Sequence, residues 1–441
     1  MRVPYAALGA LALLLQTAGA QKVSYSDTSG LSFYQGTKTQ RVGGDPVPTG
    51  AYTTYRSKIT LTGAASSRTT HSGSSSGSSS GSVTVSFPTG SLTTAGNLTA
   101  TASGPPEPTN TQPCNNHVEL CTRKFSNVTQ VGCHNSPFVR PGNSGSNQEL
   151  DVKTQLDDGV RFLQAQMQFP ANSSVPHFCH TTCDLLDAGP ITDWLSEVAE
   201  WVDAHPYDVV TVLLENGNYS DPSIYVPYIE QTGILKYTFV PTVFPMSLDD
   251  WPTLENMIIH GNRVVMFLDY KANQTAYPWL MDEFSQMWET PFDPVDRTFP
   301  CTVQRPPDLS TEAAEDRLYL MNHNLNAEFN VFSLELLVPA VSLLNETNAA
   351  EGYGSVGLAA NNCRAAWGRA PNVLNVDYYN YGTPAGSVFE AAARLNNVTY
   401  NNTCCGKVQA SGASALVGGS RGVVLSWAGV VSLVASALLM L

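Results

Sequence analysis

Six runs of near-continuous apolar residues recur along the chain after residue 113, with polar, turn-forming residues between them. Strands of a parallel sheet show this pattern when helices cover both faces of the sheet, because every side chain is then buried. The runs therefore predict parallel strands at residues 128–133, 160–167, 209–214, 263–268, 317–321 and 372–376.

Helical periodicity lies between these runs and is clearest after Pro190. Its apolar residues share the three-and-four spacing that places side chains on one face of a helix. They are Ile191, Trp194, Leu195, Val198, Trp201 and Val202. Pro190 suits the start of this helix, and Pro206 ends it.

Strands that alternate with helices over residues 113–408 predict an α/β domain of the TIM-type (β/α)8 class, for which about 250 residues are typical. A doubly wound open sheet is the alternative. That fold usually carries a glycine-rich dinucleotide fingerprint, which we do not find in this sequence.

The two ends of the chain resemble targeting signals rather than parts of the fold. Residues 1–20 combine a basic start, a short apolar run and small residues before the cleavage point, which predicts a secretory signal peptide. Residues 409–441 join small residues, a short spacer and an apolar tail, the order of a GPI-attachment signal. We therefore expect a secreted protein anchored at the cell surface, on the plasma membrane or the cell wall. The candidate attachment residues are Ser411, Gly412 and Ser414.

Residues 21–112 form a low-complexity region before the predicted barrel, with HSGSSSGSSSGS at 71–82. Most of this region has too few apolar groups to offset the entropy of ordering it. It predicts a disordered Ser/Thr/Gly-rich stalk, whose role the sequence leaves open.

Composition narrows the set of partners and supports the secretory route. The chain has 37 acidic and 23 basic residues, a net charge of −14, and no basic cluster of the kind that nucleic-acid binding needs. Nine cysteines predict mostly disulfides with at least one residue left over, although their pairing stays open, as does the oligomeric state. Glycosylation sequons, which fit a secreted glycoprotein, start at Asn97, Asn127, Asn172, Asn218, Asn273, Asn345, Asn397 and Asn401.

Polar residues follow the predicted strands at their carboxyl ends, where TIM barrels place their chemistry. They include His134, Asn135, Gln164, Gln166, His180, Glu215, Asp269, Lys271, Asn322, His323 and Asp377. Two histidines can divide acid–base work, one removing a proton from the attacking oxygen and one protonating the leaving oxygen. The pair His134 and His180 therefore fits phosphodiester cleavage in a polar pocket.

The order of several motifs resembles the PLC-like phosphodiesterase superfamily, in its secreted, GPI-anchored fungal branch. The motifs are VGCHNSPF, QLDDGVRFLQAQ, HFCHTTCDLLDAGPITDWLSEVAEWVDAHPYDVVTVLLENG, RLYLMNHN and PNVLNVDYYN. The superfamily includes the X domain of phosphatidylinositol-specific phospholipase C. The resemblance implies a TIM barrel in which His134 is the general base on an inositol hydroxyl and His180 is the general acid for the leaving alkoxide. Attack by the neighbouring hydroxyl would give a cyclic phosphodiester.

The chain departs from both branches of that superfamily. Metal-independent bacterial members have an acidic residue and a phosphate-clamping arginine where this chain has Asn135 and Gln166. Calcium-dependent eukaryotic members match Asn135 and Glu215, but their second-strand carboxylates correspond to Gln164 and Gln166. Calcium prefers several charged oxygen ligands, so this set is incomplete unless an aspartate joins it, and the cofactor stays open with no metal ligand assigned.

We therefore expect a phosphoric diester hydrolase acting on an inositol phospholipid or a glycosylated head group. The residues expected to bind substrate are Asn135, Gln166, Glu215, Lys271 and Asp377, with Lys271 as a point charge for phosphate. The alternative is a catalytically weak barrel that serves as a cell-surface or cell-wall binding protein. The amides Gln164 and Gln166 favour this alternative, whereas the histidines favour the enzyme. Another phosphodiester, or a metal-dependent sphingomyelinase-like activity, is a third interpretation.

Overall fold

The computed structural model describes residue 52 and residues 57–60, 112–331, 334–401 and 404–405. The predicted signal peptide, the predicted GPI signal and most of the predicted stalk lie outside the described residues. In the part of the chain that is described, no helix is both long and apolar enough to cross a membrane.

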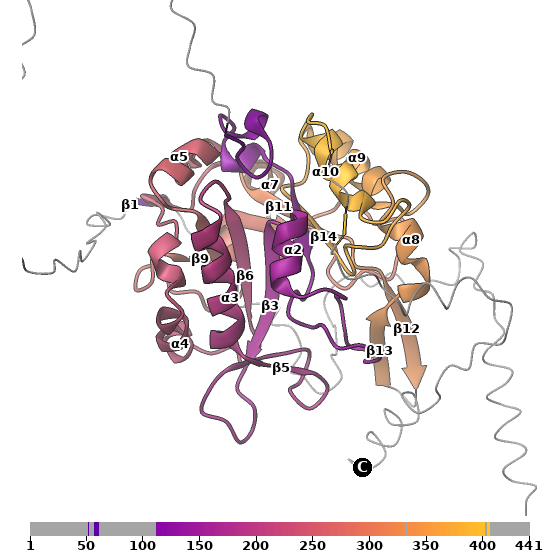
Figure 1. Cartoon of the computed structure of the whole chain (residues 1–441), viewed down its shortest axis with the longest axis horizontal. Helices are drawn as coiled ribbons and strands as arrows, with labels where there is room; N and C mark the ends of the chain where they lie inside the picture. The colour runs from indigo at the N-terminus through magenta and orange to yellow at the C-terminus, as the bar shows by residue number, and fades with distance from the viewer. Residues whose placement is uncertain (1–51, 53–56, 61–111, 332–333, 402–403, 406–441) are drawn as a thin grey trace, which may run out of the picture.

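Eight parallel strands form one curled sheet in which the last strand pairs with the first, as in a TIM barrel (Figure 1). Six of them confirm the strands predicted from the apolar runs. Two more, of three residues each, are too short to produce a recognisable pattern. The strands are β2 (Gln130–Cys133), β3 (Phe162–Gln168), β6 (Val210–Asn216), β8 (Val264–Leu268), β9 (Leu280–Asp282), β10 (Met287–Glu289), β11 (Leu318–Asn322) and β14 (Val373–Val376).

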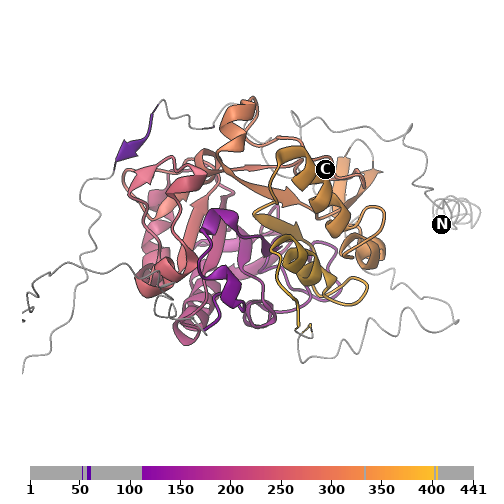
Figure 2. The ribbon, with the colours of Figure 1, turned by 90° about the horizontal axis from the view of Figure 1, so that it is seen from above.

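Helices cover the outside of this sheet, and the chain winds around it so that the last helix returns beside the first strand (Figure 2). The predicted helix is confirmed as α3, with Pro190 as its N-cap and His205 as its C-cap. The helices are α2 (Val152–Asp158), α3 (Ile191–Ala204), α4 (Val226–Gln231), α5 (Leu254–Ile259), α6 (Glu283–Gln286), α7 (Thr311–Glu315), α8 (Leu344–Thr347), α9 (Val356–Trp367) and α10 (Ser387–Leu395). Single turns of 3-10 helix are η2 (Val118–Leu120), η3 (Phe125–Asn127), η4 (Pro222–Ile224), η5 (Ile234–Tyr237), η6 (Leu248–Asp250) and η7 (Val341–Leu343).

Antiparallel strands extend the sheet at its carboxyl end. The strands β4 (His177–Cys179) and β5 (Asp187–Pro190) continue from the tip of β3, where Phe178 lies opposite Met167. A separate hairpin, β12 (Asn326–Val331) and β13 (Leu334–Pro339), follows β11 (Figure 1).

Side chains alternate between two apolar clusters, as the period of a strand requires. On β6, Val212 and Leu214 belong to the cluster that packs against the helices, whereas Leu213 belongs to the cluster inside the barrel. The inner cluster occupies the amino end of the barrel. On β2, a Cβ at Gly132 would lie 2.9 Å from Val373 and 3.1 Å from Phe162, so only glycine fits there.

One seam interrupts the ring of strands. Between β9 and β10 the chain forms the four-residue helix α6, and within the described residues these two strands do not pair with each other. The free edge of β10 instead forms an antiparallel bridge between Glu289 and Arg305. Tyr52 packs beside this seam, with its ring 4.8 Å from that of Phe284.

Residues 57–60 correct the predicted stalk locally. There the chain forms β1 (Ile59–Thr60), which pairs with β7 (Val243–Phe244), and Lys58 forms an ion pair with Asp250. The short Ile59–Thr60 strand has no periodicity of its own, since its partner strand supplies the order.

Four disulfides hold the described part of the chain, and the leftover ninth cysteine is Cys133, which is buried. The odd cysteine count therefore reflects a thiol inside the fold. The disulfides join Cys114 to Cys121, Cys179 to Cys183, Cys301 to Cys363 and Cys404 to Cys405.

Candidate active site

Polar side chains gather where the parallel strands end, which we call the mouth of the barrel. Each is buried although it is charged or polar, and each lies within the last three positions of a strand or in the two residues that follow it. Burying polar groups costs free energy unless they find partners, so such a collection is typical of a functional site. The mouth residues are His134, Asn135, Gln166, Glu215, Asp269, Glu289, Asn322 and Asp377.

His134 is held by an aspartate from the neighbouring strand. Its Nδ1 lies 2.7 Å from Oδ1 of Asp377, which also accepts a hydrogen bond of 2.9 Å from Nδ2 of Asn147. Because the carboxylate accepts, Nδ1 of His134 carries the proton and Nε2 is left for chemistry. Nδ2 of Asn135 lies 3.2 Å from that Nε2.

The charge of Asp377 sets the protonation of His134. Burial alone would lower the pKa of His134, but the carboxylate and its hydrogen bond outweigh burial and raise the pKa above 6.5. Asp293 and Glu215 add smaller contributions in the same direction. Asp377 therefore stabilises the protonated form of His134. This suits a general base, because a histidine base becomes an imidazolium when it takes a proton.

His180 follows β4 and is only partly exposed. Its ring stacks on Phe138, with the ring centroids 5.0 Å apart, and its Nδ1 donates to the carbonyl oxygen of Gly145 at 2.5 Å. Because Nδ1 is bonded to this carbonyl, His180 exchanges protons through Nε2. The disulfide between Cys179 and Cys183 encloses the residue in a short loop.

One loop connects the two histidines. It begins at His134 itself, packs Phe138 against His180, and returns past Gly145 to Asn147, which contacts Asp377. The structure therefore brings both predicted catalytic residues to the loop that follows β2, at the same end of the barrel.

Gln164 and Gln166, the two glutamines of β3 that the sequence analysis singled out, are engaged within the fold. Gln164 donates to Glu215 at 2.7 Å and accepts from Asn375 at 2.5 Å, so it links three strands across the mouth. Oε1 of Gln166 accepts from the backbone N–H of Thr181 at 3.1 Å, directly after His180. Gln166 thus positions the turn that carries His180.

Arg305 is a buried cation at the mouth that the sequence analysis missed. It forms an ion pair of 3.1 Å with Glu289, faces Asp269 at 3.7 Å and donates to the Tyr270 hydroxyl at 3.1 Å. These carboxylates already neutralise it, so Arg305 is not available as a phosphate clamp. It stands in a Pro-rich loop outside every apolar run, where no spacing marks it.

Asp269 shares the mouth with a second carboxylate. Burial and the charge of Glu215 raise the pKa of Asp269 to about 7, although Arg305 and the backbone N–H groups of Asn216 and Tyr270 oppose this rise. Burial beside Glu215 therefore favours protonation of Asp269 relative to a carboxyl in water.

Two other polar residues at strand ends do not join the cluster. Lys271 is exposed with a left-handed backbone (φ 61°), and no hydrogen bond or ion pair joins its side chain to another described residue. His323 is buried, its Nε2 bonds the Thr347 carbonyl at 2.9 Å, and burial lowers its pKa to about 3. It therefore stays neutral and structural.

The donors at the mouth do not fit a calcium ion. Glu215 accepts from Gln164, Asp269 accepts from two backbone N–H groups, and β3 offers amides where charged oxygens would be needed. Among the described residues, the three-ligand group of acidic, cysteine or histidine side chains is Asp158 with Cys404 and Cys405, and those sulfurs are disulfide-bonded. We therefore assign no metal to the site.

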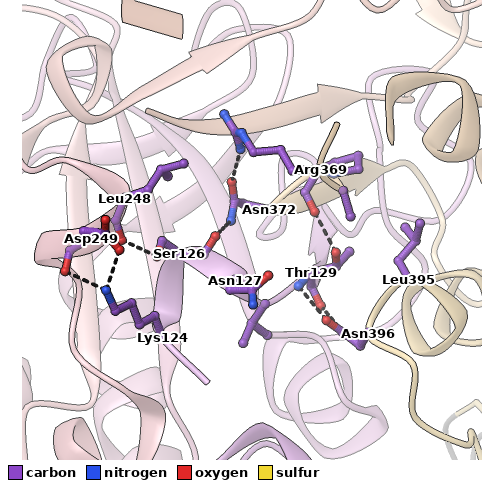
Figure 3. Close-up of a pocket in the computed structure, with 13 residues that line it drawn as sticks. Lys124, Ser126, Asn127, Thr129, Leu248, Asp249, Arg369, Asn372, Leu395 and Asn396 are labelled. Carbon is purple, nitrogen blue, oxygen red and sulfur yellow. Dashed lines mark hydrogen bonds and ion pairs between the residues drawn. The ribbon is translucent and has the colours of Figure 1, made fainter. Parts of the chain in front are cut away.

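A cavity of about 290 Å³ lies at the opposite, amino end of the barrel (Figure 3). Lys124 is paired there with Asp249, and Thr129 with Asn396, at the start of β2. None of the predicted site residues lines it, so this cavity is separate from the mouth.

Comparison with known proteins identifies the family. The family model described as PI-PLC X 1 matches residues 120–396. An "Uncharacterized secreted protein" of Arthroderma benhamiae is 44% identical over 409 residues, covering 92% of this chain and 91% of that protein. A "PI-PLC X domain-containing protein 1" of the same organism is 40% identical over 287 residues, covering 65% and 90% respectively. The phosphatidylinositol-specific phospholipase C from Listeria monocytogenes aligns structurally over 63% of this chain and 96% of its own, with 14% identity and a TM-score of 0.40. The chain therefore belongs to the PI-PLC X domain family.

Proposed function

We propose that this protein is a phosphoric diester hydrolase in which His134 is the general base and His180 the general acid. The observation that carries the proposal is the buried hydrogen bond between His134 and Asp377, at the end of the barrel where His180 also lies. A histidine with one nitrogen bonded to a carboxylate and the other directed to chemistry is suited to proton transfer near neutral pH.

The reaction proceeds in two steps. Nε2 of His134 takes the proton of a hydroxyl next to the phosphodiester, the hydroxyl oxygen bonds to phosphorus, and His180 protonates the leaving oxygen as its bond to phosphorus breaks. Asp377 stabilises the imidazolium formed on His134. Water then opens the cyclic diester with the two roles reversed, since each histidine now holds the opposite protonation state.

Few groups at the mouth are available to stabilise charge on the phosphoryl oxygens. Arg305 is neutralised by carboxylates, and Lys271 lies outside the buried cluster. The amide of Asn135 is then left for this role, and a dipole is weaker than a cation in it. We expect turnover to be modest for this reason. The amides Gln164 and Gln166, where charged groups would be expected, favour the second candidate function, a binding barrel with weak catalysis.

We also propose that the chain is secreted, glycosylated and held at the cell surface by a GPI anchor added near residues 411–414. The naming of a relative as a secreted protein supports the secretory route, and the order of residues 409–441 supports the anchor. Treatment of expressing cells with a GPI-cleaving phospholipase should release into the medium a protein that ends near residues 411–414, whereas a protein held by a membrane-spanning helix would stay with the cells.

Turnover with matched variants tests the enzymatic proposal. Release of head group from phosphatidylinositol and from glycerophosphoinositol is followed with calcium and with chelator. His134→Ala and His180→Ala are each expected to lower kcat by about 10²–10⁴-fold, whereas the wild type should be unaffected by chelator. His260→Ala is the control, because His260 is an exposed residue that ends α5 outside the mouth. No turnover by a well-folded wild type on either substrate would favour the binding barrel.

A further inference from the structure

Glycosylation sequons border the mouth of the barrel. Asn172 follows β3, Asn218 follows β6 and Asn273 follows β8, and these are three neighbouring strands of the sheet. Asn345 approaches from the other side, where its Oδ1 meets the loop after β14. All four asparagines are exposed. Asn397, in contrast, follows Asn396, whose side chain bonds Thr129 at the amino end.

Hydrogen bonds hold two of these side chains by their oxygen atoms and leave the reactive nitrogen unbonded. Oδ1 of Asn218 accepts the backbone N–H of Phe169 at 3.0 Å, and Oδ1 of Asn273 accepts that of Ala276 at 3.1 Å. Only the oxygen of an amide can accept from a backbone N–H, so the orientation is fixed. Nδ2, the atom to which an N-glycan is attached, therefore has no hydrogen bond to another described residue at either position.

The same three loops lack the features with which a protein binds a lipid surface. Their large apolar side chains are buried or only partly exposed, whereas exposed ones occur elsewhere, including Val341 and Tyr353 on either side of Asn345 in the chain. Residues 169–176, 217–221 and 269–279 contain one cation, Lys271. Membrane binding at an interface depends on buried apolar area and on attraction of basic residues to anionic lipids, and these loops supply little of either.

We propose that N-glycans on Asn172, Asn218 and Asn273 stand between the mouth and any bilayer, so that the substrate is a phosphodiester presented clear of the lipid surface. The substrate class is then a water-soluble phosphodiester, or a head group that projects well beyond the bilayer. Glycans are bulky and solvated, and three on adjacent loops prevent the mouth from lying flat on lipid. This inference rests on the proposed phosphodiesterase activity of the same site.

Sequons can be removed without touching the asparagines. Ser174→Ala, Ser220→Ala and Thr275→Ala abolish the three sequons and leave the Oδ1 hydrogen bonds of Asn218 and Asn273 intact. Thr399→Ala is the matched control, because it removes the sequon of Asn397 at the amino end through an exposed residue. All variants are expressed in a glycosylating host and end at residue 408, which keeps every described residue and avoids a lipid anchor.

The measurements are site occupancy by peptide mass and turnover of two probes, soluble glycerophosphoinositol and phosphatidylinositol in phosphatidylcholine vesicles. We expect occupied sites and a strong preference for the soluble probe in the wild type. The triple variant should gain at least fivefold on vesicles and keep its rate on the soluble probe, whereas Thr399→Ala should change neither.

Unoccupied asparagines, or vesicle turnover by the glycosylated protein equal to that on the soluble probe, would overturn the inference. An unchanged vesicle rate in the triple variant would do the same. If no protein cleaves either probe, the proposed function fails on its own, and co-sedimentation with the vesicles then decides the inference. In that case the triple variant must bind more than the wild type does.

Discussion

Nδ1 of His134 lies 2.7 Å from Oδ1 of Asp377, although 243 positions separate the two residues in the chain. The contact exists because β2 and β14 are neighbours in register, with Cys133 opposite Val376, so the next residue on each strand emerges at the same point. Gln148 fixes this corner by donating to the carbonyls of both His134 and Val376. Pairing of the first and last strands of the barrel thus creates the contact between His134 and Asp377.

Replacement of Asp377 by Asn should separate the electrostatic role of this contact from its geometric role. The substitution removes the charge that raises the pKa of His134, so burial should then bring that pKa down below its value in the wild type. We expect kcat to fall by about 10²–10⁴-fold and the acid limb of kcat/KM to move to lower pH. The pH–rate profile measures both effects, and an acid limb that does not move would refute this role.

The pH dependence of stability should run against that of activity. The folded pKa of His134 is raised above 6.5, so its contribution to stability is complete below pH 6.5 and is lost as pH rises through the folded pKa. Activity should rise over the same interval, because only neutral His134 accepts a proton. Urea unfolding and kcat/KM between pH 5.5 and 8.5 test this, with His134→Gln lacking this part of the pH dependence of stability.

Gln166 should act on catalysis through His180 rather than through phosphate. Gln166→Met leaves the N–H of Thr181 without its acceptor, which costs about 1–3 kcal/mol and displaces the His180 turn. We expect kcat to fall more than KM rises. Gln166→Glu keeps an acceptor for Thr181 and should recover part of kcat, whereas equal loss in both variants would indicate that Gln166 contacts the substrate directly.

Two short disulfides offer a comparison between the two ends of the barrel. Opening the Cys179–Cys183 loop by double substitution with Ser should cost about 2 kcal/mol of stability and also most of the activity, because that loop carries His180. The Cys114–Cys121 loop is also short and encloses η2, away from the mouth. Its removal should lower stability by a similar amount and leave kcat unchanged. Equal activity in the two double variants would contradict a catalytic role for His180.

Arg305 should be one of the most costly single positions to change. Arg305→Met leaves Glu289 buried without its partner, and breaking a buried pair in this way costs about 3–5 kcal/mol. Arg394→Met is the control, since Arg394 pairs with Glu351 and Glu390 on the surface, where such pairs contribute about 0–1 kcal/mol. Urea unfolding of the two variants should differ clearly, and similar midpoints would refute the role of the buried cluster.

The sequence predicted the parts of the fold that depend on local pattern. The apolar runs that became β3, β6 and β8 are long enough to be recognised, whereas β9 and β10 have three residues each and owe their conformation to neighbours. Asp377 was recognisable as a polar residue at a strand end. Its contact with His134 could not be predicted from the sequence pattern, because the contact depends on the pairing of β14 with β2.

Other features of the site depend on contacts that no sequence pattern encodes. Arg305 reaches Glu289 and Asp269 from an irregular loop, and its burial follows from three-dimensional packing alone. Lys271 follows β8 as the sequence suggested, but a left-handed turn leaves it exposed. His180 depends on the short strand β4, whose register against β3 is set by the sheet.

The seam between β9 and β10 has a consequence for how this family can vary. Backbone hydrogen bonds join the other strands whatever their side chains are, but at the seam the ring is held by Arg305, which reaches from Glu289 on β10 to Asp269 after β8. At the seam, the side-chain contacts of Arg305 therefore take the place of the backbone hydrogen bonds that join the other parallel strands. Among related chains, we therefore expect loss of Arg305 to occur only together with loss of its carboxylate partners Glu289 and Asp269.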